Sequence, residues 1–470
     1  MSTTRNSGPE YPISLRPKTT TATKVLIVFA LAVIACCFFA TPTHAQTPLS
    51  LGTLSTGGVN NPPTPCNNGN GWYYFNNNFA IVPMNCQTAT VSGCNNLGVT
   101  TSDNWPVTIG YLNPVGIVPG VTVAQGLIIL HGGGNGTAPE SYALADNYFR
   151  AGYEVVQVVW GDDWELISDP INSGYGNIQA AACRPATAFN WISTNLFPTV
   201  FNANSQAGMC ALGDSAGSAA VAYSMAYYNA GSYLDNVELL SGPVLSDVEQ
   251  GCQWKPQAAS VTVCSSTSKN GGYGCQLGGG STWTLSPTYL SGANSSVGGW
   301  TNDMSCANAN GLNQSTTQQS ETQWLLQSLV DQSNITGLGA TPTFNYPSTA
   351  MSAWLCRSVQ ANPNFACAAN NNNNYNSCPN NSSPQGQLFY QNILSTSAPP
   401  HFAVYAVDNC SNAEGVGGGT VPGFYPQDFG GTQSGGGNAG GFAAITDDMV
   451  GHVSGTTQIP AQCVHRIHTQ

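Results

Sequence analysis

Short apolar runs alternate with helical segments along the chain from residue 106 onward. Residues 106–111 alternate apolar and polar positions as a strand does, and residues 126–130 form a continuous apolar run typical of a buried strand. The same patterns predict strands at 153–159, up to Leu212, at 237–240 and at 401–407, and helices near 139–150, 178–196 and 216–229. This order predicts an α/β fold with a mostly parallel central sheet flanked by helices.

The alternation stops after residue 240 and resumes at residue 401. Between them the sequence carries seven cysteines, from Cys252 to Cys378, together with five tryptophans and several glycine clusters. We expect a large disulfide-rich cap or lid, inserted at about 250–398 into a catalytic domain that spans 106–470. The chain is expected to end in a glycine-rich loop and a helix near 457–467.

The N-terminus has the pattern of a signal peptide. Basic residues precede an apolar stretch from Val25 to Ala40, which leads to small residues at Thr43 and Ala45. The stretch is shorter than the roughly 20 residues that span a bilayer. We therefore predict removal of residues 1–45 and export to an extracellular or periplasmic compartment. A lipoprotein signal modified at Cys36 is the alternative.

Cysteine usage supports an oxidising compartment. Of 16 cysteines, Cys36 and Cys37 lie in the predicted signal peptide, so an even number remains, enough for up to seven disulfides. The sequence contains no Cys-x-x-Cys pair, so we predict structural disulfides and no metal site. Residues 46–105, rich in asparagine and glycine, are expected to be an irregular segment held by disulfides.

The chain is acidic overall but carries few charges. Charged residues make up 7% of it, and the formal net charge is −12. This balance argues against nucleic acid as a partner and leaves a neutral small-molecule or polymeric substrate as the expected one. The scarcity of charge also suggests adaptation to acidic surroundings, because few surface carboxylates would change protonation as the pH falls.

The sequence Gly213-Asp-Ser-Ala-Gly217 lies between a predicted strand and a helix of small residues. Gly-x-Ser-x-Gly in this context is typical of a nucleophile elbow, in which glycines allow strand and helix to approach closely. The N-terminus of the helix favours developing negative charge. Ser215 is therefore the predicted nucleophile.

The sequence His131-Gly-Gly-Gly134 directly follows the predicted strand at 126–130. Glycines there leave backbone N–H groups free to bind the oxygen that becomes negative in a tetrahedral intermediate. An ordinary glycine turn between strand and helix is the alternative.

Together these two motifs resemble those of the hormone-sensitive-lipase-like carboxylesterases of the α/β-hydrolase superfamily. The resemblance covers the core of the chain. It implies that the backbone amides of Gly133, Gly134 and Ala216 form an oxyanion hole around Ser215 and that His131 is structural. Ser218 stands where that family commonly has another glycine.

The order of catalytic residues in this fold, serine, then acid, then histidine, points to Asp408 and His452. Asp408 directly follows the strand at 401–407, where a carboxylate could orient an imidazole. His452 lies in an expected loop and would act as general base in its neutral form. Weaker candidates are Asp247, Glu414, Asp447 and Asp448 for the acid, and His401, His465 and His468 for the base.

Possible substrate contacts follow the strand at 153–159 and precede the nucleophile. They are Trp160, Asp162, Trp164 and Asp214. The sequence thus predicts a secreted serine hydrolase that cleaves carboxylic esters through an acyl-enzyme and needs no cofactor. An extracellular polyester depolymerase, a peptidase, and a catalytically inactive binding module of the same fold are the alternatives.

Overall fold

The computed structural model describes the main body of the chain after residue 47. The described residues are 48–240, 342–356, 389–407 and 440–468, with gaps at 57–62, 67–72, 76–80, 98–103, 133–135, 141, 166, 169–172, 175–177, 215, 390–391, 394–395, 397–398 and 455–456, and the strands at 259–262 and 282–285. The predicted signal peptide lies outside them. None of the described helices is long and apolar enough to cross a membrane.

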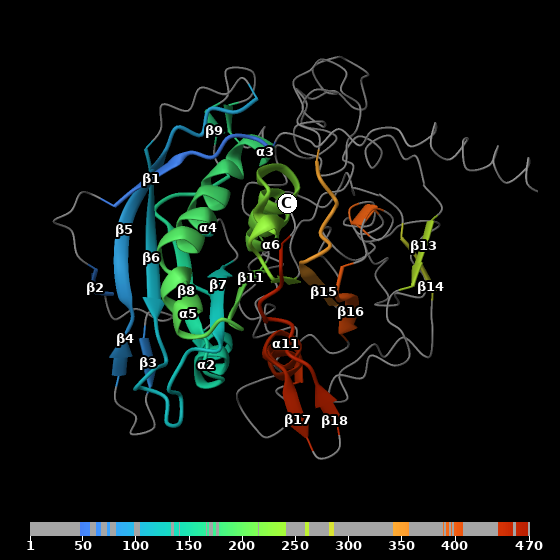
Figure 1. Ribbon diagram of the computed structural model, residues 1–470. Helices are drawn as coiled ribbons and strands as arrows, with labels where there is room; N and C mark the ends of the chain where they lie inside the picture. Colours follow the sequence, from blue (N-terminus) through green and yellow to red (C-terminus); the bar gives the residue numbers. More distant parts are fainter. Residues whose placement is uncertain are drawn as a thin grey trace, which may run out of the picture. The chain divides into compact units, whose positions relative to one another are not determined.

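The centre of the described fold is a sheet of ten strands (Figure 1). Its order is β1-β5-β6-β8-β7-β11-β12-β15-β16, and β2 pairs with β5. Neighbouring strands are parallel from β8 to β16, whereas β5 and β6 are antiparallel to their neighbours. The strands are β1 (Thr53–Ser55), β2 (Thr64–Pro65), β5 (Asn85–Ser92), β6 (Trp105–Leu112), β7 (Gly126–His131), β8 (Glu154–Trp160), β11 (Gly208–Asp214), β12 (Asn236–Leu240), β15 (Ala350–Cys356) and β16 (Phe402–Val407).

Helices cover both faces of the sheet, as the sequence predicts for an α/β-hydrolase fold. Alternate residues of β8 point to opposite faces, so that Val156 and Val158 pack with α4 and α6 while Val155 packs with α2 and α11. The helices are α2 (Tyr142–Arg150), α3 (Ile178–Ala181), α4 (Cys183–Asn195), α5 (Phe197–Ala203), α6 (Ala216–Tyr228), the 3₁₀ helix η2 (Ala230–Ser232) and α11 (Gly440–Val450).

Four pairs of short antiparallel strands lie outside the central sheet. They are β3 (Tyr73–Phe75) with β4 (Ile81–Pro83), β9 (Ile167–Ser168) with β10 (Ser173–Gly174), β13 (Ala259–Thr262) with β14 (Thr282–Leu285), and β17 (His452–Ser454) with β18 (Thr457–Ile459). Only the last pair bears on the predicted site, because it begins with His452.

Three elements differ from the sequence prediction. The segment 46–105 contains β5, an eight-residue strand of the central sheet, whose many polar residues hide its alternating burial. The predicted insertion at 250–398 contains β15, which lies between β12 and β16 in the sheet. The expected helix at 457–467 is absent, since β18 and an extended segment occupy those positions and Pro460 lacks the N–H that a helix needs.

Three disulfides join distant parts of the described chain. Cys66–Cys86 lies within the N-terminal segment, and Cys94–Cys183 ties that segment to α4. Cys210–Cys463 links β11 to residues 463–468, here called the C-terminal segment, across a sequence separation of 253 residues. The predicted structural role of cysteine is confirmed for these six residues.

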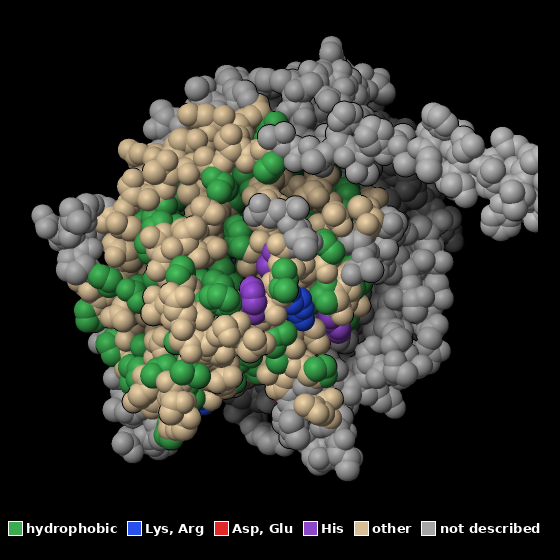
Figure 2. Space-filling view, viewed as in Figure 1, with side chains coloured by type: hydrophobic (Ala, Val, Ile, Leu, Met, Phe, Trp, Pro, Cys, Tyr) green, Lys and Arg blue, Asp and Glu red, His purple; other side chains and the backbone are tan. Residues whose placement is uncertain are grey.

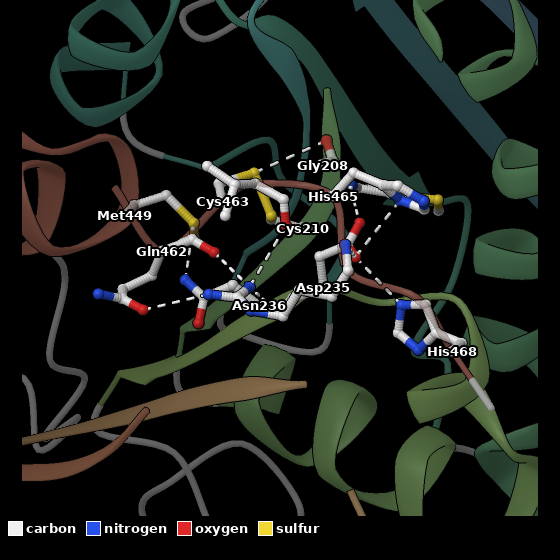
Figure 3. Close-up of a disulfide and its surroundings, with 12 residues drawn as sticks. Gly208, Cys210, Asp235, Asn236, Met449, Gln462, Cys463, His465 and His468 are labelled. Atoms are coloured by element: carbon white, nitrogen blue, oxygen red, sulfur yellow. Dashed lines mark hydrogen bonds and ion pairs between the residues drawn. A yellow bond between two sulfur atoms is a disulfide. The ribbon is translucent and has the colours of Figure 1, made fainter. Parts of the chain in front are cut away.

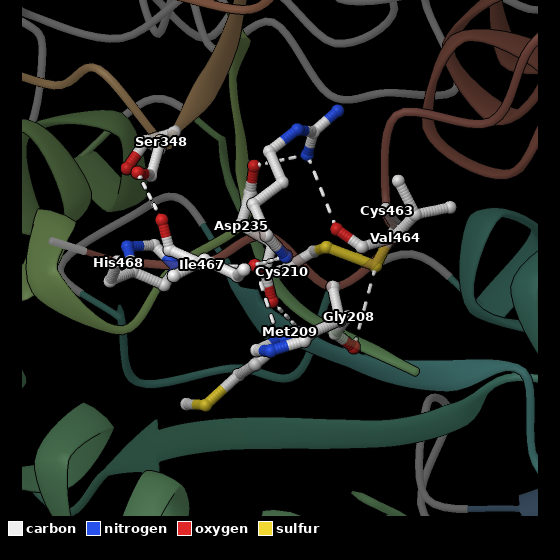
Figure 4. A network of polar contacts seen from close by, with 12 residues as sticks. Gly208, Met209, Cys210, Asp235, Ser348, Cys463, Val464, Ile467 and His468 are labelled. Carbon is white, nitrogen blue, oxygen red and sulfur yellow. Dashed lines mark hydrogen bonds and ion pairs between the residues drawn. A yellow bond between two sulfur atoms is a disulfide. The ribbon is translucent and has the colours of Figure 1, made fainter. Parts of the chain in front are cut away.

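The C-terminal segment crosses the N-terminal ends of β11 and β12 (Figures 3 and 4). Asp235, which is 1% exposed, accepts hydrogen bonds from the backbone N–H groups of Met209 (2.8 Å) and Arg466 (2.6 Å). Its carboxylate also lies 3.1 Å from Nε2 of His468, and the Arg466 guanidinium donates to the Asp235 carbonyl at 2.6 Å. Asp235 therefore binds both β11 and the C-terminal segment, and these hydrogen bonds hold the segment in place.

Loss of the Cys210–Cys463 disulfide should destabilise the fold strongly. The combined substitutions Cys210→Ser and Cys463→Ser remove a cross-link between residues 253 apart, and we expect the free energy of unfolding to fall by about 2–5 kcal/mol. Removal of Cys66–Cys86, which closes a loop of only 20 residues, should cause a loss that is smaller by about 2 kcal/mol, because a shorter loop restricts the unfolded chain less. Guanidinium unfolding under oxidising conditions measures both losses, and equal losses would contradict this dependence on loop length.

Candidate functional site

The elements that flank Ser215 form a tight strand-to-helix turn. Strand β11 ends at Asp214 and α6 begins at Ala216; Ser215 itself lies outside the described residues. A Cβ atom on Gly213 would lie 2.2 Å from the carbonyl oxygen of Gly217. Only glycine allows strand and helix to approach this closely, which is the physical requirement of a nucleophile elbow.

The start of the glycine loop packs directly against this turn. His131 at the end of β7 is paired with Gly213 of β11, and a Cβ atom on Gly217 would lie 1.9 Å from the His131 carbonyl oxygen. Gly133 and Gly134, the predicted oxyanion-hole donors, lie outside the described residues. The described backbone on either side of them nevertheless brings the loop to the N-terminus of α6, where Ala216 is the first helical residue.

His131 forms a buried support beneath the loop. Its side chain is fully buried; Nε2 accepts a hydrogen bond from the Trp160 indole at 2.9 Å, and Nδ1 lies 3.2 Å from the carbonyl oxygen of Gly132. Burial lowers the pKa of the His131 imidazole to about 4, so the ring is neutral near pH 7. Because both nitrogens are engaged within the core, His131 orients the loop rather than accepting a proton from Ser215.

Ser218 adds a second support that sequence reasoning missed. Its buried hydroxyl lies 2.7 Å from the carbonyl oxygen of Gly213 and 2.8 Å from that of Leu240. These carbonyls belong to the ends of β11 and β12, so the hydroxyl ties the first turn of α6 to both strands. The sequence signal was the serine at a position where the resembled family commonly has glycine.

The four predicted substrate contacts lie in different environments. Trp160 and Trp164 are 2% and 0% exposed and pack around His131, with the Trp164 ring in T-shaped contact 6.0 Å away. Asp214 is 1% exposed at the end of β11, whereas Asp162 is exposed and accepts the backbone N–H of Asp163 at 2.8 Å. The two tryptophans therefore stabilise the site from within the core, and of the four only Asp162 has its side chain in solvent.

His452, the predicted general base, lies at the start of a hairpin. His452 begins β17, directly after α11, and its side chain lies outside the described part of the chain. At the end of α11, Met449 accepts a hydrogen bond from Asn236, the first residue of β12. After the hairpin, Cys463 is joined to Cys210 (Figure 3). Both ends of the hairpin are thus fixed at the N-terminal ends of the strands.

β11 ends at the opposite edge of the sheet. Its last residue, Asp214, is four residues beyond Cys210, or about 13 Å along an extended strand. In Figure 1 the β17–β18 hairpin extends away from the edge toward which β7 points. The role of His452 as general base stays a prediction, because neither Ser215 nor the His452 side chain is among the described residues.

The remaining histidines of the predicted mature chain do not replace it. His401 precedes β16, and its carbonyl accepts the N–H of Met351 at the N-terminal end of β15. His465 and His468 lie 3.7 and 3.1 Å from Asp235, just before β12. Five histidines follow residue 45, and the structure describes the backbone of each. Apart from the buried His131, all lie at the edge opposite the elbow.

Asp408 directly follows β16 and lies outside the described residues. Since β16 is parallel to β15, β15 to β12, and β12 to β11, β16 ends at the same edge of the sheet as β11. Among the residues that the structure describes, no group of histidine, cysteine and acidic side chains is arranged to hold a metal ion.

No family model and no curated protein sequence matches the chain. Solved structures with a similar chain path include acetyl xylan esterase 1 from Thermoanaerobacterium sp. JW/SL YS485, at 11% identity and a TM-score of 0.36, covering 71% of this chain and 80% of the esterase. A putative carboxylesterase from Lactobacillus plantarum WCFS1 has 14% identity and a TM-score of 0.32, and the match covers 71% of this chain and 90% of the carboxylesterase. A Pyrobaculum calidifontis esterase has 11% identity and a TM-score of 0.30, and the match covers 69% of this chain and 76% of the esterase. This likeness is one of fold.

Gly217→Ala should disrupt the elbow. The added methyl group would lie 1.9 Å from the His131 carbonyl oxygen, so the loop must move, and a displacement of about 1 Å lowers turnover about 100-fold. Ester hydrolysis and circular dichroism would be measured together. Thr194→Ala is the control, because Thr194 is exposed on α4 and its hydroxyl bonds within its own helix. Unchanged turnover in Gly217→Ala would contradict the packing described.

His452→Ala tests the predicted general base. If His452 takes the Ser215 proton, ester hydrolysis should fall by about 100-fold or more, because a general base contributes that much to the rate. The rate with a p-nitrophenyl ester at pH 7 measures this. Turnover within about twofold of the parent chain, in a variant with an unchanged melting temperature, would contradict the prediction.

Proposed function

We propose that this chain is a secreted serine hydrolase that cleaves carboxylic esters, with Ser215 as its nucleophile. The observation that carries the proposal is the contact between the backbone of His131 and Gly217, which packs a glycine loop against the turn that presents Ser215. A nucleophile and an oxyanion hole must lie side by side in this way to share one carbonyl group.

The reaction follows from these groups. The Ser215 oxygen attacks the acyl carbon of the ester, and the carbonyl oxygen becomes negative within reach of the amides of Gly133, Gly134 and Ala216. The N-terminus of α6 adds a favourable partial charge. The C–O bond then breaks, the alcohol leaves with a proton, and water releases the acid from the acyl-enzyme. No cofactor is required.

The buried residues beneath the loop support this chemistry by limiting motion. His131 is held between the Trp160 indole and the Gly132 carbonyl, and Ser218 ties α6 to the ends of β11 and β12. Donors that are already oriented need no reorganisation when the oxyanion forms. This rigid support favours catalysis by a preformed hole.

Ser215 needs a general base, and His452 with Asp408 is the predicted pair. β16, which precedes Asp408, ends at the same edge as β11, whereas the β17 backbone begins near the N-terminal ends of the strands. A carboxylate can also accept a proton as general base, although it is a weaker base than imidazole. The rates of His452→Ala and Asp408→Asn, compared with the parent chain, show which group takes the proton.

The position of the histidines also favours a second candidate. An α/β-hydrolase fold that has lost its imidazole base could serve as a binding module, which retains the elbow without turnover. The same measurements distinguish the two functions, because labelling of Ser215 and release of alcohol both require an activated hydroxyl.

Ser215→Ala should abolish ester hydrolysis, with a loss of at least about 1,000-fold, because the nucleophile is removed while the oxyanion donors remain. Hydrolysis of p-nitrophenyl acetate, butyrate and palmitate by the oxidised protein from Gln46 gives the rate and the chain-length preference. A fluorophosphonate probe, followed by peptide mapping, gives the site of reaction.

Thr194→Ala is a suitable control, since Thr194 is exposed on α4 and bonds only to its own helix in the described contacts. Turnover with labelling at Ser215 supports the esterase. A folded protein with neither turnover nor label would favour the binding module. Clearing of a polyester film, tested alongside, would identify a depolymerase among the esterases.

A further inference from the structure

Glu238 is a carboxyl group enclosed in the centre of the sheet. It lies in the middle of β12, is 0% exposed, and neither of its carboxyl oxygens has a hydrogen-bond partner among the described residues. Among the described residues, the ionisable groups that interact with Glu238 are Asp448 of α11 and Tyr148 of α2. Burial and the charge of Asp448 raise the pKa of Glu238 well above its usual range.

Asp448 belongs to the same enclosed group. The Ser352 hydroxyl donates to its carboxylate, and Nε2 of His401 lies 3.5 Å from its other oxygen. Glu140, which is 4% exposed, adds a further acidic charge near Tyr148. Two helices and two strands therefore enclose three acidic side chains, with one partly exposed histidine as the only ionisable base in these contacts.

Glu165 is a second carboxyl group of this kind, on the other face of the sheet. It is 1% exposed, and neither oxygen has a hydrogen-bond partner among the described residues. Asp163 and Tyr223 of α6 face it, while Arg184 of α4 donates to the Trp164 carbonyl and stacks over the Trp105 ring. Burial, followed by the charge of Asp163, raises the pKa of Glu165 well above its usual range.

Glu154 is the third. It is 5% exposed at the start of β8, where the Asn113 amide donates to one oxygen at 2.7 Å and Tyr111 lies close by. Burial raises the pKa of Glu154 to about 7, against the smaller opposing effect of the Asn113 hydrogen bond. These three sites contrast with Asp235, which Arg466 and two histidines surround.

We propose that the folded chain holds protons on Glu154, Glu165 and Glu238 and is therefore adapted to acidic surroundings, where its stability is greatest. A carboxyl group that keeps its proton when folded stabilises the native state at low pH. That contribution is lost as the pH rises from the ordinary range near 4.5 through the raised value. For Glu154 the loss falls between about pH 4.5 and about pH 7.

His131 acts in the opposite direction. Its lowered pKa means that the unfolded chain binds a proton more readily below about pH 6.5, so acid weakens this one contribution. Acid thus weakens the contribution of one imidazole to stability and preserves the contributions of three carboxyl groups, so these four groups together make the folded state more stable at low pH. On the face shown in Figure 2 the described side chains are mostly hydrophobic or uncharged, and no acidic side chain is visible.

The test compares Glu238→Gln and Glu165→Gln with the parent chain between pH 4 and pH 7. Glutamine has the shape of a protonated glutamate but cannot ionise. We expect each variant to melt about 2 °C or more above the parent at pH 7 and within about 1 °C of it at pH 4. The parent itself should melt at a lower temperature at pH 7 than at pH 4.

Asp162→Asn is the matched control, since Asp162 is an exposed acid in the same loop as Glu165 and should show no such difference. A parent chain whose melting temperature rises from pH 4 to pH 7 would overturn the proposal. So would glutamine variants that lose as much stability at pH 7 as at pH 4. If one variant does not fold, the other and the parent profile still decide. No outcome depends on ester hydrolysis.

Discussion

The carbonyl oxygen of His131 occupies the space where a side chain on Gly217 would begin. This contact between two backbones fixes the distance between the strand that ends in the glycine loop and the helix that follows Ser215. The hydrogen bonds of His131 below the loop and of Ser218 behind the elbow keep the same spacing. The predicted oxyanion donors and nucleophile adjoin this contact in the chain, so their spacing depends on it.

The direction of the strands decides which residues can share this site. Parallel strands place all their C-terminal ends at one edge, so Asp214, the end of β7 and the end of β16 lie together. Their N-terminal ends gather the other groups: Asp235, His401 and the end of α11. Asp235 and His401 therefore lie at the edge opposite the described ends of the glycine loop.

Much of this could be predicted from local patterns. The β7, β8, β11 and β12 strands are short apolar runs buried on both faces, and the two glycine motifs follow their strands directly. β5 escaped prediction because half its residues are polar, and β15 because it lies among cysteine- and glycine-rich sequence. The backbone position of His452 could not be predicted for another reason. Chain order gives the sequence of elements, but the edge at which a residue emerges depends on the packing of α11 against α2, and one sequence does not show that packing.

The disulfide between β11 and the C-terminal segment closes a covalent ring over most of the catalytic domain. Every residue from 211 to 462 lies inside that ring, including the cysteine-rich region between β12 and β15. A single cut by a protease within it leaves both fragments attached to each other, and the segment that crosses β11 and β12 stays bound. A cut in that region therefore does not release the C-terminal strands from the rest of the fold.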